Sequence, residues 1–585
     1  MSQSYFFNYA RNRNDQDLHR QYLAVRDSVT LYDEVTRSDN NNYNHRYDGR
    51  FEISIDSSQS LIVQPKLYFQ NNRASSTLSG MNSSSTSQLI NSAMNDNGKT
   101  STGHDLSNQL TYRYRFPQRG RTLSADLRMG MNRKDGSGEL RSLAEYYDPM
   151  GTTGDTLDQH STAETDGVTF SSRIAYTEPL TDDGILQFSY NPSYSKNNSD
   201  NRKFNFDAST QTYTELDTSL TNSYDNTYTT HNAGLGYRLR GSTYNITADL
   251  AYQIAALHGE QTYPVASMID KTFYTILPSA MLNIRPSEQS NLRLFYRTST
   301  REPSISQLQD VIDNSNPLLL STGNPDLKQS YNHTLVARYS LTSAERSRSF
   351  FILVSAGSSS DYIGNATLIA QRDTMLAGGL TLSRGAQLTL PVNLDGSRNL
   401  RTFLTYGVPL DFLQSNLNFN SGVTYTRTPG MINDELNNTS STAMSAGAVL
   451  GSNVSEDLDF TLSYSGSYNV ARNSAQAQLD NEYYTHAAGV KLNWTFWQGI
   501  VFRTEFTNTL YNGSTGNLHE RSSLWNINFG KKFLADDRGE IRASVTDVLN
   551  QNQSINRSVT ETYIEDSENN VLGRYFMIVL TYMLR

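Results

Sequence analysis

The segment DFTLSYSGSYNV, residues Asp459–Val470, alternates between two kinds of side chain. Large apolar residues take one parity and small polar residues take the other, namely Phe460, Leu462 and Tyr464 against Thr461, Ser463 and Ser465. Successive side chains of a β-strand point to opposite faces, so the segment predicts a strand with one apolar and one polar face. Such a face can cover a soluble core or meet lipid, and the rest of the chain must decide which.

The same alternation recurs in neighbouring segments, HAAGVKLNWTF (486–496), VFRTEFTNTL (501–510) and WNINFG (525–530). Their polar parity carries Ser, Thr, Asn and charged residues, which suits a water-filled interior. If these strands line a lumen, three charged side chains are expected to face it: Lys491, Arg503 and Glu505.

Composition narrows the class of protein. The chain has 585 residues, of which only 36% are hydrophobic, and its mean hydropathy is −0.57. It has no cysteine, which excludes disulfides, thiolate metal sites and cysteine nucleophiles. The net charge is −9 and no basic block occurs, which argues against nucleic acid as a partner. No apolar run reaches the roughly 18 residues of a membrane-spanning helix, whereas a closed β-barrel crosses a membrane with a weaker signal.

Short turn signals divide the chain at intervals. Ten tight turns are expected, at 56–60, 117–120, 179–184, 238–242, 285–290, 342–347, 408–415, 454–459, 497–499 and 535–540. Long polar segments lie between them, such as 74–105 and 146–167, and these are expected to be solvated loops joining strands of about 10 to 14 residues.

The pattern predicts an all-β fold, a transmembrane antiparallel β-barrel of about 22 strands with short periplasmic turns and long extracellular loops. Ten internal turns give eleven hairpins, with both chain ends at the short-turn side, and 22 strands is a size class whose lumen is plugged. We expect residues 1–585 to form this single barrel domain. A soluble or secreted all-β binding protein would alternate too, but we find no fixed repeat, and the expected strands exceed the usual 5–6 residues.

One stretch, residues 292–339, resembles the mid-barrel signature of TonB-dependent outer-membrane receptors. A strand ending in Tyr296 and Arg297 leads into a Pro-containing loop and then a G-N-P-x-L-K segment, whose signature residues are Pro303, Gly323, Asn324, Pro325, Leu327 and Lys328. Segments 543–554 and 573–585 are similar to the family's last strands. The whole chain is most similar to the Bacteroidota-type outer membrane protein beta-barrel group. For the Asn-Pro pair we expect a structural role, because Pro fixes φ where a strand begins.

The resemblance implies import of a solute across the outer membrane, with outer-membrane lipid around the barrel. It also implies a TonB complex as partner, provided that a plug and a TonB box precede this chain, and it allows a surface lipoprotein partner. A signal peptide, TonB box and plug are not visible in the sequence given. The alternatives are a plugless passive pore or a surface-exposed barrel without energy coupling. The solute itself is unknown.

Motifs of catalysis and of bound groups are not found. The chain carries no G-x-S-x-G, H-E-x-x-H, P-loop or phosphate-binding glycine fingerprint. Its nine His are scattered, and its paired carboxylates, such as Asp182 with Asp183, fall in expected turns. We therefore expect no enzyme, no cofactor and no metal site.

Overall fold

In the computed structural model, the described part of the chain lies between residues 1 and 583. The residues it describes exclude 23–29, 85, 149–150, 219, 264–265, 315, 344, 377–380, 453–454, 456, 476–479, 514–518, 553, 560–562 and 572.

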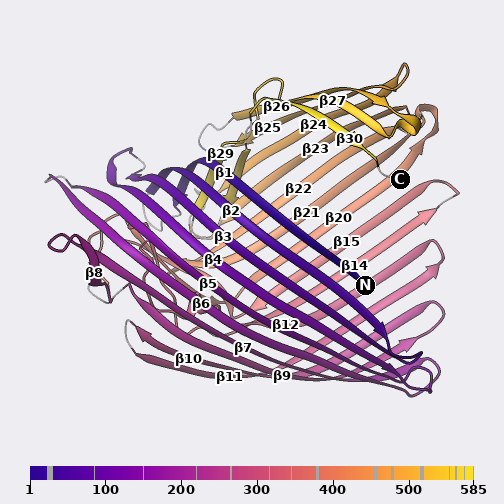
Figure 1. Cartoon of the computed structure of the whole chain (residues 1–585), viewed down its shortest axis with the longest axis horizontal. Helices are drawn as coiled ribbons and strands as arrows, with labels where there is room; N and C mark the ends of the chain where they lie inside the picture. Colours follow the sequence, from indigo (N-terminus) through magenta and orange to yellow (C-terminus); the bar gives the residue numbers. More distant parts are fainter. Residues whose placement is uncertain are drawn as a thin grey trace.

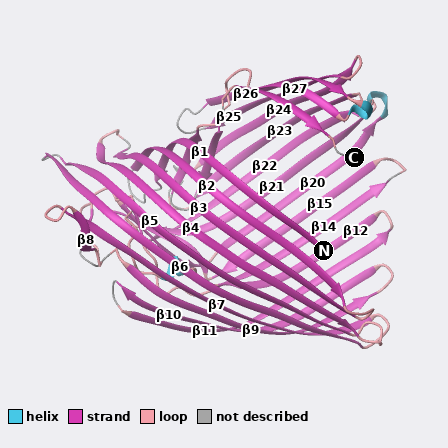
Figure 2. Ribbon diagram, in the orientation of Figure 1, coloured by secondary structure: helices cyan, strands magenta, loops and turns pink. Residues whose placement is uncertain are grey.

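A single curved antiparallel sheet forms the wall of the molecule (Figures 1 and 2). The sheet has 28 strands, and six of them belong to loops, which leaves 22 that follow one another as a meander. These are β1 (Ser2–Tyr22), β2 (Thr30–Ser54), β3 (Gln59–Ser84), β4 (Leu89–Arg115), β5 (Thr122–Asp148), β6 (Gly151–Pro179), β7 (Gly184–Asp207), β9 (Asn222–Arg240), β10 (Tyr244–Tyr263), β11 (Ser267–Ser287), β12 (Ser290–Arg301), β14 (Ser330–Ser343), β15 (Arg348–Ser360), β20 (Ser397–Leu410), β21 (Ser415–Ile432), β22 (Glu435–Ser452), β23 (Leu458–Asn473), β24 (Asn481–Phe496), β25 (Ile500–Gly513), β26 (His519–Phe533), β27 (Gly539–Thr546) and β30 (Tyr575–Tyr582).

The loops hold the remaining elements. These are β8 (Thr212–Leu216), α1 (Ile305–Leu308), β13 (Leu319–Ser321), β16 (Tyr362–Ile369), β17 (Thr374–Met375), β18 (Thr381–Leu382), β19 (Gln387–Leu394), β28 (Ser554–Val559) and β29 (Tyr563–Asn569), together with two single 3-10 turns at Asp411–Leu413 and Ala535–Asp537. The described residues contain no helix long and apolar enough to cross a membrane.

The ten expected tight turns all join consecutive wall strands at one end of the sheet, the right-hand end of Figure 1. Residue 344 of the turn at 342–347 and residues 454 and 456 of the turn at 454–459 lie outside the described residues. The turn between β2 and β3 shows how such a turn is held. The Asp56 carboxylate accepts hydrogen bonds from the Ser58 hydroxyl (2.6 Å), the Ser58 backbone N–H (2.7 Å) and the Gln59 backbone N–H (2.9 Å). These bonds hold the pKa of Asp56 below its ordinary value.

Two expected loops are wrong. Most of segment 74–105 lies within β3 and β4, and most of segment 146–167 lies within β5 and β6, so that strands β2 to β7 have 24 to 29 residues. The expectation of about 10 to 14 residues holds only farther along, where β12, β14, β15, β20 and β25 have 12 to 14. A polar segment remains a strand when both neighbouring strands pair its backbone, and Ser, Thr and Asn give no apolar signal of that pairing.

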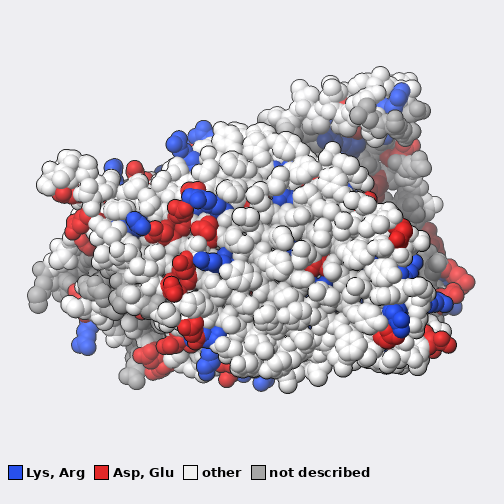
Figure 3. Space-filling view, turned by 60° about the horizontal axis from the view of Figure 1, so that its bottom comes forward, with Lys and Arg blue, Asp and Glu red and all other residues white. Residues whose placement is uncertain are grey.

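The two faces of the wall differ as the alternation predicted. Leu462 is paired with Leu450 on one side and Val490 on the other, and Val490 is paired with Phe506, so one face carries a continuous apolar row. Leu462 is 43% exposed and Tyr464 is 46% exposed, as expected for side chains that face lipid. Figure 3 shows the outer surface of the sheet at β9, β10 and β11. Charged residues gather toward its two ends, and the broad band between them is almost free of charge.

The first and last wall strands do not pair with each other in the described residues. β30 pairs with β27, and β1 pairs on its free side with β29 along Gln16–Tyr22. Figure 1 shows the resulting opening between β30 and the N-terminal half of β1. The β28–β29 hairpin therefore bridges the seam at the long-loop end. Arg20 in β1 donates to Glu565 in β29 (2.9 Å), and Arg557 in β28 is paired with Asp566 (2.5 Å).

Candidate functional site

Two long loops fold into the interior at the long-loop end. One joins β12 to β14 and comprises residues 302–329; the other joins β15 to β20 and comprises residues 361–396. We call them the lumenal loops. They pair with each other, because β13 of the first forms a short parallel ladder with β19 of the second, and β19 forms a hairpin with β16. The loops share a small core that contains Leu320, Ala370 and Leu382.

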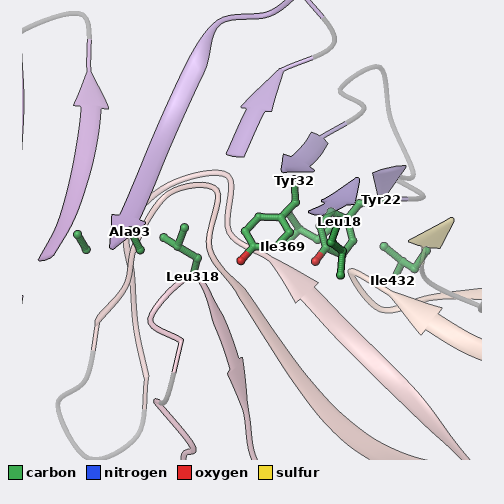
Figure 4. Packing of buried hydrophobic residues seen from close by; sticks show 8 residues of the cluster. Leu18, Tyr22, Tyr32, Ala93, Leu318, Ile369 and Ile432 are labelled. Atoms are coloured by element: carbon green, nitrogen blue, oxygen red, sulfur yellow. The ribbon is translucent and has the colours of Figure 1, made fainter. Parts of the chain in front are cut away.

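The lumenal loops pack on the inner face of the wall (Figure 4). Leu318 and Ile369 from the loops share a buried cluster with Leu18 and Tyr32 from β1 and β2. On β2 the outward side chains of Val35 and Tyr43 are exposed, whereas Tyr32 is fully buried. The cluster also includes Tyr22, Ala93, Ala144 and Ile432. Apolar burial of this kind stabilises a loop that would otherwise be solvated.

Polar contacts tie the loops to the same wall. The Asn316 amide donates to the Tyr32 hydroxyl (2.9 Å), and that hydroxyl donates to the Glu34 carboxylate (2.6 Å). The Asn91 amide on β4 donates to the Arg384 carbonyl in the second loop (2.8 Å). Each loop therefore has both an apolar and a hydrogen-bonded attachment.

The signature segment Gly323–Lys328 lies where the two loops meet. Gly323 N–H donates to the Gln309 carbonyl (2.8 Å), and a Cβ at Gly323 would collide with the Gln309 backbone, so the close approach requires glycine. The Asn324 amide donates to the Pro391 carbonyl (3.0 Å). Lys328 N–H donates to the Asn393 side chain (2.7 Å). The segment thus fastens one lumenal loop to the other.

The remaining signature residues contact the wall or the loop interior. Lys271 on β11 donates to the carbonyls of Pro325 (2.8 Å) and Leu327 (2.9 Å). The Leu327 side chain is buried against Leu257 and Leu308, and Pro303 is buried as well. All of these are structural contacts. Whether any signature residue also meets a solute stays a prediction.

A cavity of about 670 Å³ separates the first lumenal loop from the inner face of β4 to β7 and the start of β9. Its lining is mostly amide, hydroxyl and charged, and no aromatic side chain belongs to it in the described residues. The polar residues on the wall side and the loop side include Asn97, Lys99, Glu139, Gln159, Ser161, Asn201, Lys203, Asn222, Ser306, Gln309 and Asp313.

Lys203 is the main cation at the wall of this cavity. Its ammonium donates to the Asn314 side chain of the loop (2.6 Å), whose amide donates to Gln159 on β6 (3.4 Å). Lys203 lies near the far end of the 24-residue strand β7, well past the roughly 9–11 residues that cross a bilayer. Burial lowers the pKa of Lys203 and outweighs the opposing effect of Asp313 and Asp217.

Two buried polar atoms at this cavity lack a hydrogen-bond partner within the described part of the chain. They are the Asn222 side-chain oxygen, an acceptor, and the Gln309 side-chain nitrogen, a donor. A buried amide atom without a partner costs free energy, about 1–3 kcal/mol. A ligand that offers both a donor and an acceptor would recover it.

The three predicted lumen-facing residues share one face of β24 and β25. Lys491 is paired with Glu505 across the ladder, and their charged groups form an ion pair (2.6 Å). Arg503 donates to the Glu540 carboxylate (2.7 and 3.0 Å). This face is opposite to Val490 and Phe506, so a lumenal position follows if lipid covers those. Each of the three charged side chains has a partner of opposite charge. Contact of any of them with a solute stays a prediction.

The described residues contain no group of three or more His, Asp or Glu placed to hold a metal ion.

Comparison with known proteins then identifies the chain. Residues 114–499 match the sequence model of the outer membrane protein beta-barrel family. The chain belongs to this family. It is accordingly a protein of the outer membrane. In this outer membrane barrel the short turns are periplasmic and the long loops extracellular, so the lumenal loops enter from outside. A comparison with curated protein sequences finds no match.

The chain is also similar, at low identity, to several solved structures. The FrpB iron transporter from Neisseria meningitidis is 9% identical, with 96% of this chain and 82% of that one covered and a TM-score of 0.39. The siderophore receptor PirA from Acinetobacter baumannii is 9% identical, with 97% and 80% covered and a TM-score of 0.40. The hemophore receptor HasR from Serratia marcescens, in complex with hemophore HasA and heme, is 11% identical, with 96% and 80% covered and a TM-score of 0.41.

Sequence reasoning missed the cavity and its residues. Asn222, Gln159 and Lys203 stand in polar segments rich in Asn, Ser, Thr or Asp, whose composition is that of a solvated loop. The available signal was the length of the β12–β14 and β15–β20 connections, since loops longer than about 12–15 residues are usually functional.

Proposed function

We propose that this outer membrane barrel binds a polar solute in the cavity between its first lumenal loop and the wall, and imports it. The supporting observation is the pair of buried, unpartnered amide atoms of Asn222 and Gln309 at a cavity of about 670 Å³. Ligand pockets usually have about 300–1,000 Å³. The absence of aromatic lining in the described residues favours a hydrogen-bonding solute over a flat apolar one.

The import is proposed to be energised through a TonB complex. In support, 22-stranded barrels are transporters with a filled lumen, and the sequence resembles TonB-dependent receptors around residues 292–339. The lumenal loops narrow the interior from the extracellular side. We propose that residues 1–585 act as one barrel domain. A plug with a TonB box would supply the contact to the TonB complex. A surface lipoprotein is a further proposed partner, at the long-loop end. The proposed activity is transport and not catalysis.

Two tests separate this function from a passive pore. Depletion of peptides, glycans and iron chelates from a defined medium is measured for cells with and without this chain, each with the TonB complex intact or deleted. Loss of depletion in both deletions supports energised import. Depletion that needs the chain but not TonB supports a passive pore, and a steady conductance in planar bilayers would agree with it. Depletion that needs neither contradicts import by this chain.

The binding site itself is tested with two variants and a matched control. Asn222→Ala and Gln309→Ala should each weaken uptake of the depleted solute roughly tenfold, since each removes one hydrogen bond to it. Asn283→Ala is the control, because Asn283 is also an inner-face asparagine with a buried, unpartnered oxygen but does not line the cavity. Equal loss in all three variants would contradict a site at this cavity.

A further inference from the structure

A second concave site lies on the outward face of the barrel, away from the lumen. It is a groove of about 390 Å³ across β12, β14, β15, β20 and β21. Small side chains of β15, Ala356 and Ser358, form its floor. Its two sides are formed by larger side chains: Tyr296, His333 and Leu335 on one, and Arg398, Leu400 and Tyr425 on the other. Leu335 and Leu400 are paired with Ala356 from its two sides, which places all three on one face.

The groove has an apolar end and a polar end. Leu335, Ala356 and Leu400 form one row of the ladder, two residues farther from the extracellular loops than the row of His333, Ser358 and Arg398. His333, Ser358 and Arg398 lie within a few residues of the strand ends that carry the extracellular loops. The groove therefore has the polarity of a lipid in the outer leaflet, with its acyl chain toward the bilayer centre and its headgroup outward.

Arg398 lines the polar end of the groove, and Arg427 lies beside it on the next strand. Arg398 is directly opposite Arg427 in the ladder of β20 and β21, on the outward face. Like charges at directly opposed positions destabilise a sheet. Neither arginine forms an ion pair with an acid in the described chain. Guanidinium groups bind phosphate with two parallel hydrogen bonds, so a bound phosphate would offset the repulsion.

We propose that this groove binds a phosphorylated glycolipid of the outer leaflet, with an acyl chain over Ala356 and a phosphate between Arg398 and Arg427. A neighbouring outward groove shows why the arginines matter. It has about 590 Å³ and is lined by Ile174, Phe188, Leu235 and other residues of β6 to β11, with no basic side chain among them. Ordinary bilayer lipid suffices to cover that groove, whereas the arginine pair selects an anionic headgroup. This inference is independent of the proposed import.

The test uses the full chain in detergent, titrated with bisphosphorylated lipid A and examined by native mass spectrometry. The double variant R398A/R427A should bind this lipid roughly tenfold more weakly. The matched control is R338A/R401A, which removes two arginines from the opposite face of β14 and β20. Heat-modifiable migration on a gel shows that each variant is folded.

Three comparisons assign the ligand. Lipid A without its phosphates should bind the unaltered chain as weakly as lipid A binds R398A/R427A. Inorganic phosphate in excess should compete only partly, because it lacks the acyl chain. Ala356→Phe fills the groove floor and should weaken lipid A binding while phosphate binding remains. Equal binding by R398A/R427A and R338A/R401A, equal binding of the dephosphorylated lipid, or full competition by inorganic phosphate would each overturn the proposal.

Discussion

The wall has two regions whose strands differ in length, although both regions belong to the same antiparallel sheet. Strands β2 to β7 have 24 to 29 residues, and strands β12, β14, β15 and β20 have 12 to 14. About 9–11 residues cross the bilayer, so the long strands project far into the extracellular space. The lengths of the connecting loops show the reverse, because both of the long lumenal loops join short strands.

The difference shows what the long strands are for. The lumenal loops extend from the short side and pack on the inner face of the long side, through Leu18 and Tyr32 at the cluster and Lys203 and Gln159 at the cavity. A wall that ended at the bilayer surface would leave these loops without a partner. The short strands span the membrane, and the long strands both span it and support the site.

The largest expected effect concerns this support. Tyr32→Ala should cost about 3–5 kcal/mol of loop docking, because it leaves a cavity under both loops and removes the partner of Asn316. Limited proteolysis within residues 302–329 measures docking. Val35→Ala on the outward face of the same strand is the control, with an expected change within about 0.5 kcal/mol. Similar proteolysis rates for the two variants would contradict the packing.

The next prediction distinguishes the part of a strand that lies in the bilayer from the part that projects beyond it. Leu462→Arg should lower the free energy of unfolding by about 2–4 kcal/mol, because it places a charge in lipid. Ser463→Arg, on the opposite face, should cost much less. Met94→Arg alters an outward, 64% exposed residue of the projecting part of β4, and it should cost about 0–1 kcal/mol.

Urea titration of the barrel in lipid vesicles gives the three values. Equal costs at Leu462 and Ser463 would contradict the assignment of faces. A large cost at Met94 would show that the bilayer covers more of the long strands than the roughly 9–11 residues expected to cross it.

A smaller effect is expected at the seam. Arg20→Met should loosen the β28–β29 hairpin by about 2–3 kcal/mol, since it leaves the half-buried Glu565 without its partner; the partial exposure of the pair reduces the effect. Arg11→Met on the same strand breaks an exposed pair with Asp39 and should leave the hairpin unchanged, because exposed ion pairs contribute little to stability. Hydrogen exchange of the β29 amides is the measurement, and equal exchange in both variants would rule out a bridging role.

The smallest effect is a pH dependence of loop docking. Burial lowers the pKa of Lys203 in the folded protein, so between that pKa and the ordinary pKa of lysine the undocked form binds more protons. Docking should therefore strengthen as pH rises through this window. Proteolysis within residues 302–329, corrected with an unstructured peptide, should slow toward alkaline pH in the unaltered protein. Lys203→Met should abolish this trend, and persistence of the trend would assign it to another group.

Local patterns in the sequence were sufficient for the wall. Alternation at 459–470 predicted which residues face outward, and ten turn signals predicted the number of strands, because both depend on residues a few positions apart. The polar parts of the long strands were predicted to be loops, because an alternation of apolar and polar residues marks only the part of a strand that contacts lipid. The sequence also marked Gly323–Lys328, although not what this segment joins.

Only the tertiary structure decided which distant residues meet. Lys203 and Asn314 are 111 positions apart, Arg20 and Glu565 are 545 apart, and Arg398 stands opposite Arg427 only in the observed register. Such contacts depend on how a meander curves and on which loops turn inward, and these result from packing over the whole sheet. Alternation therefore establishes a two-faced strand anywhere in the chain, whereas a cavity, a seam or an arginine pair exists only after the strands are assembled.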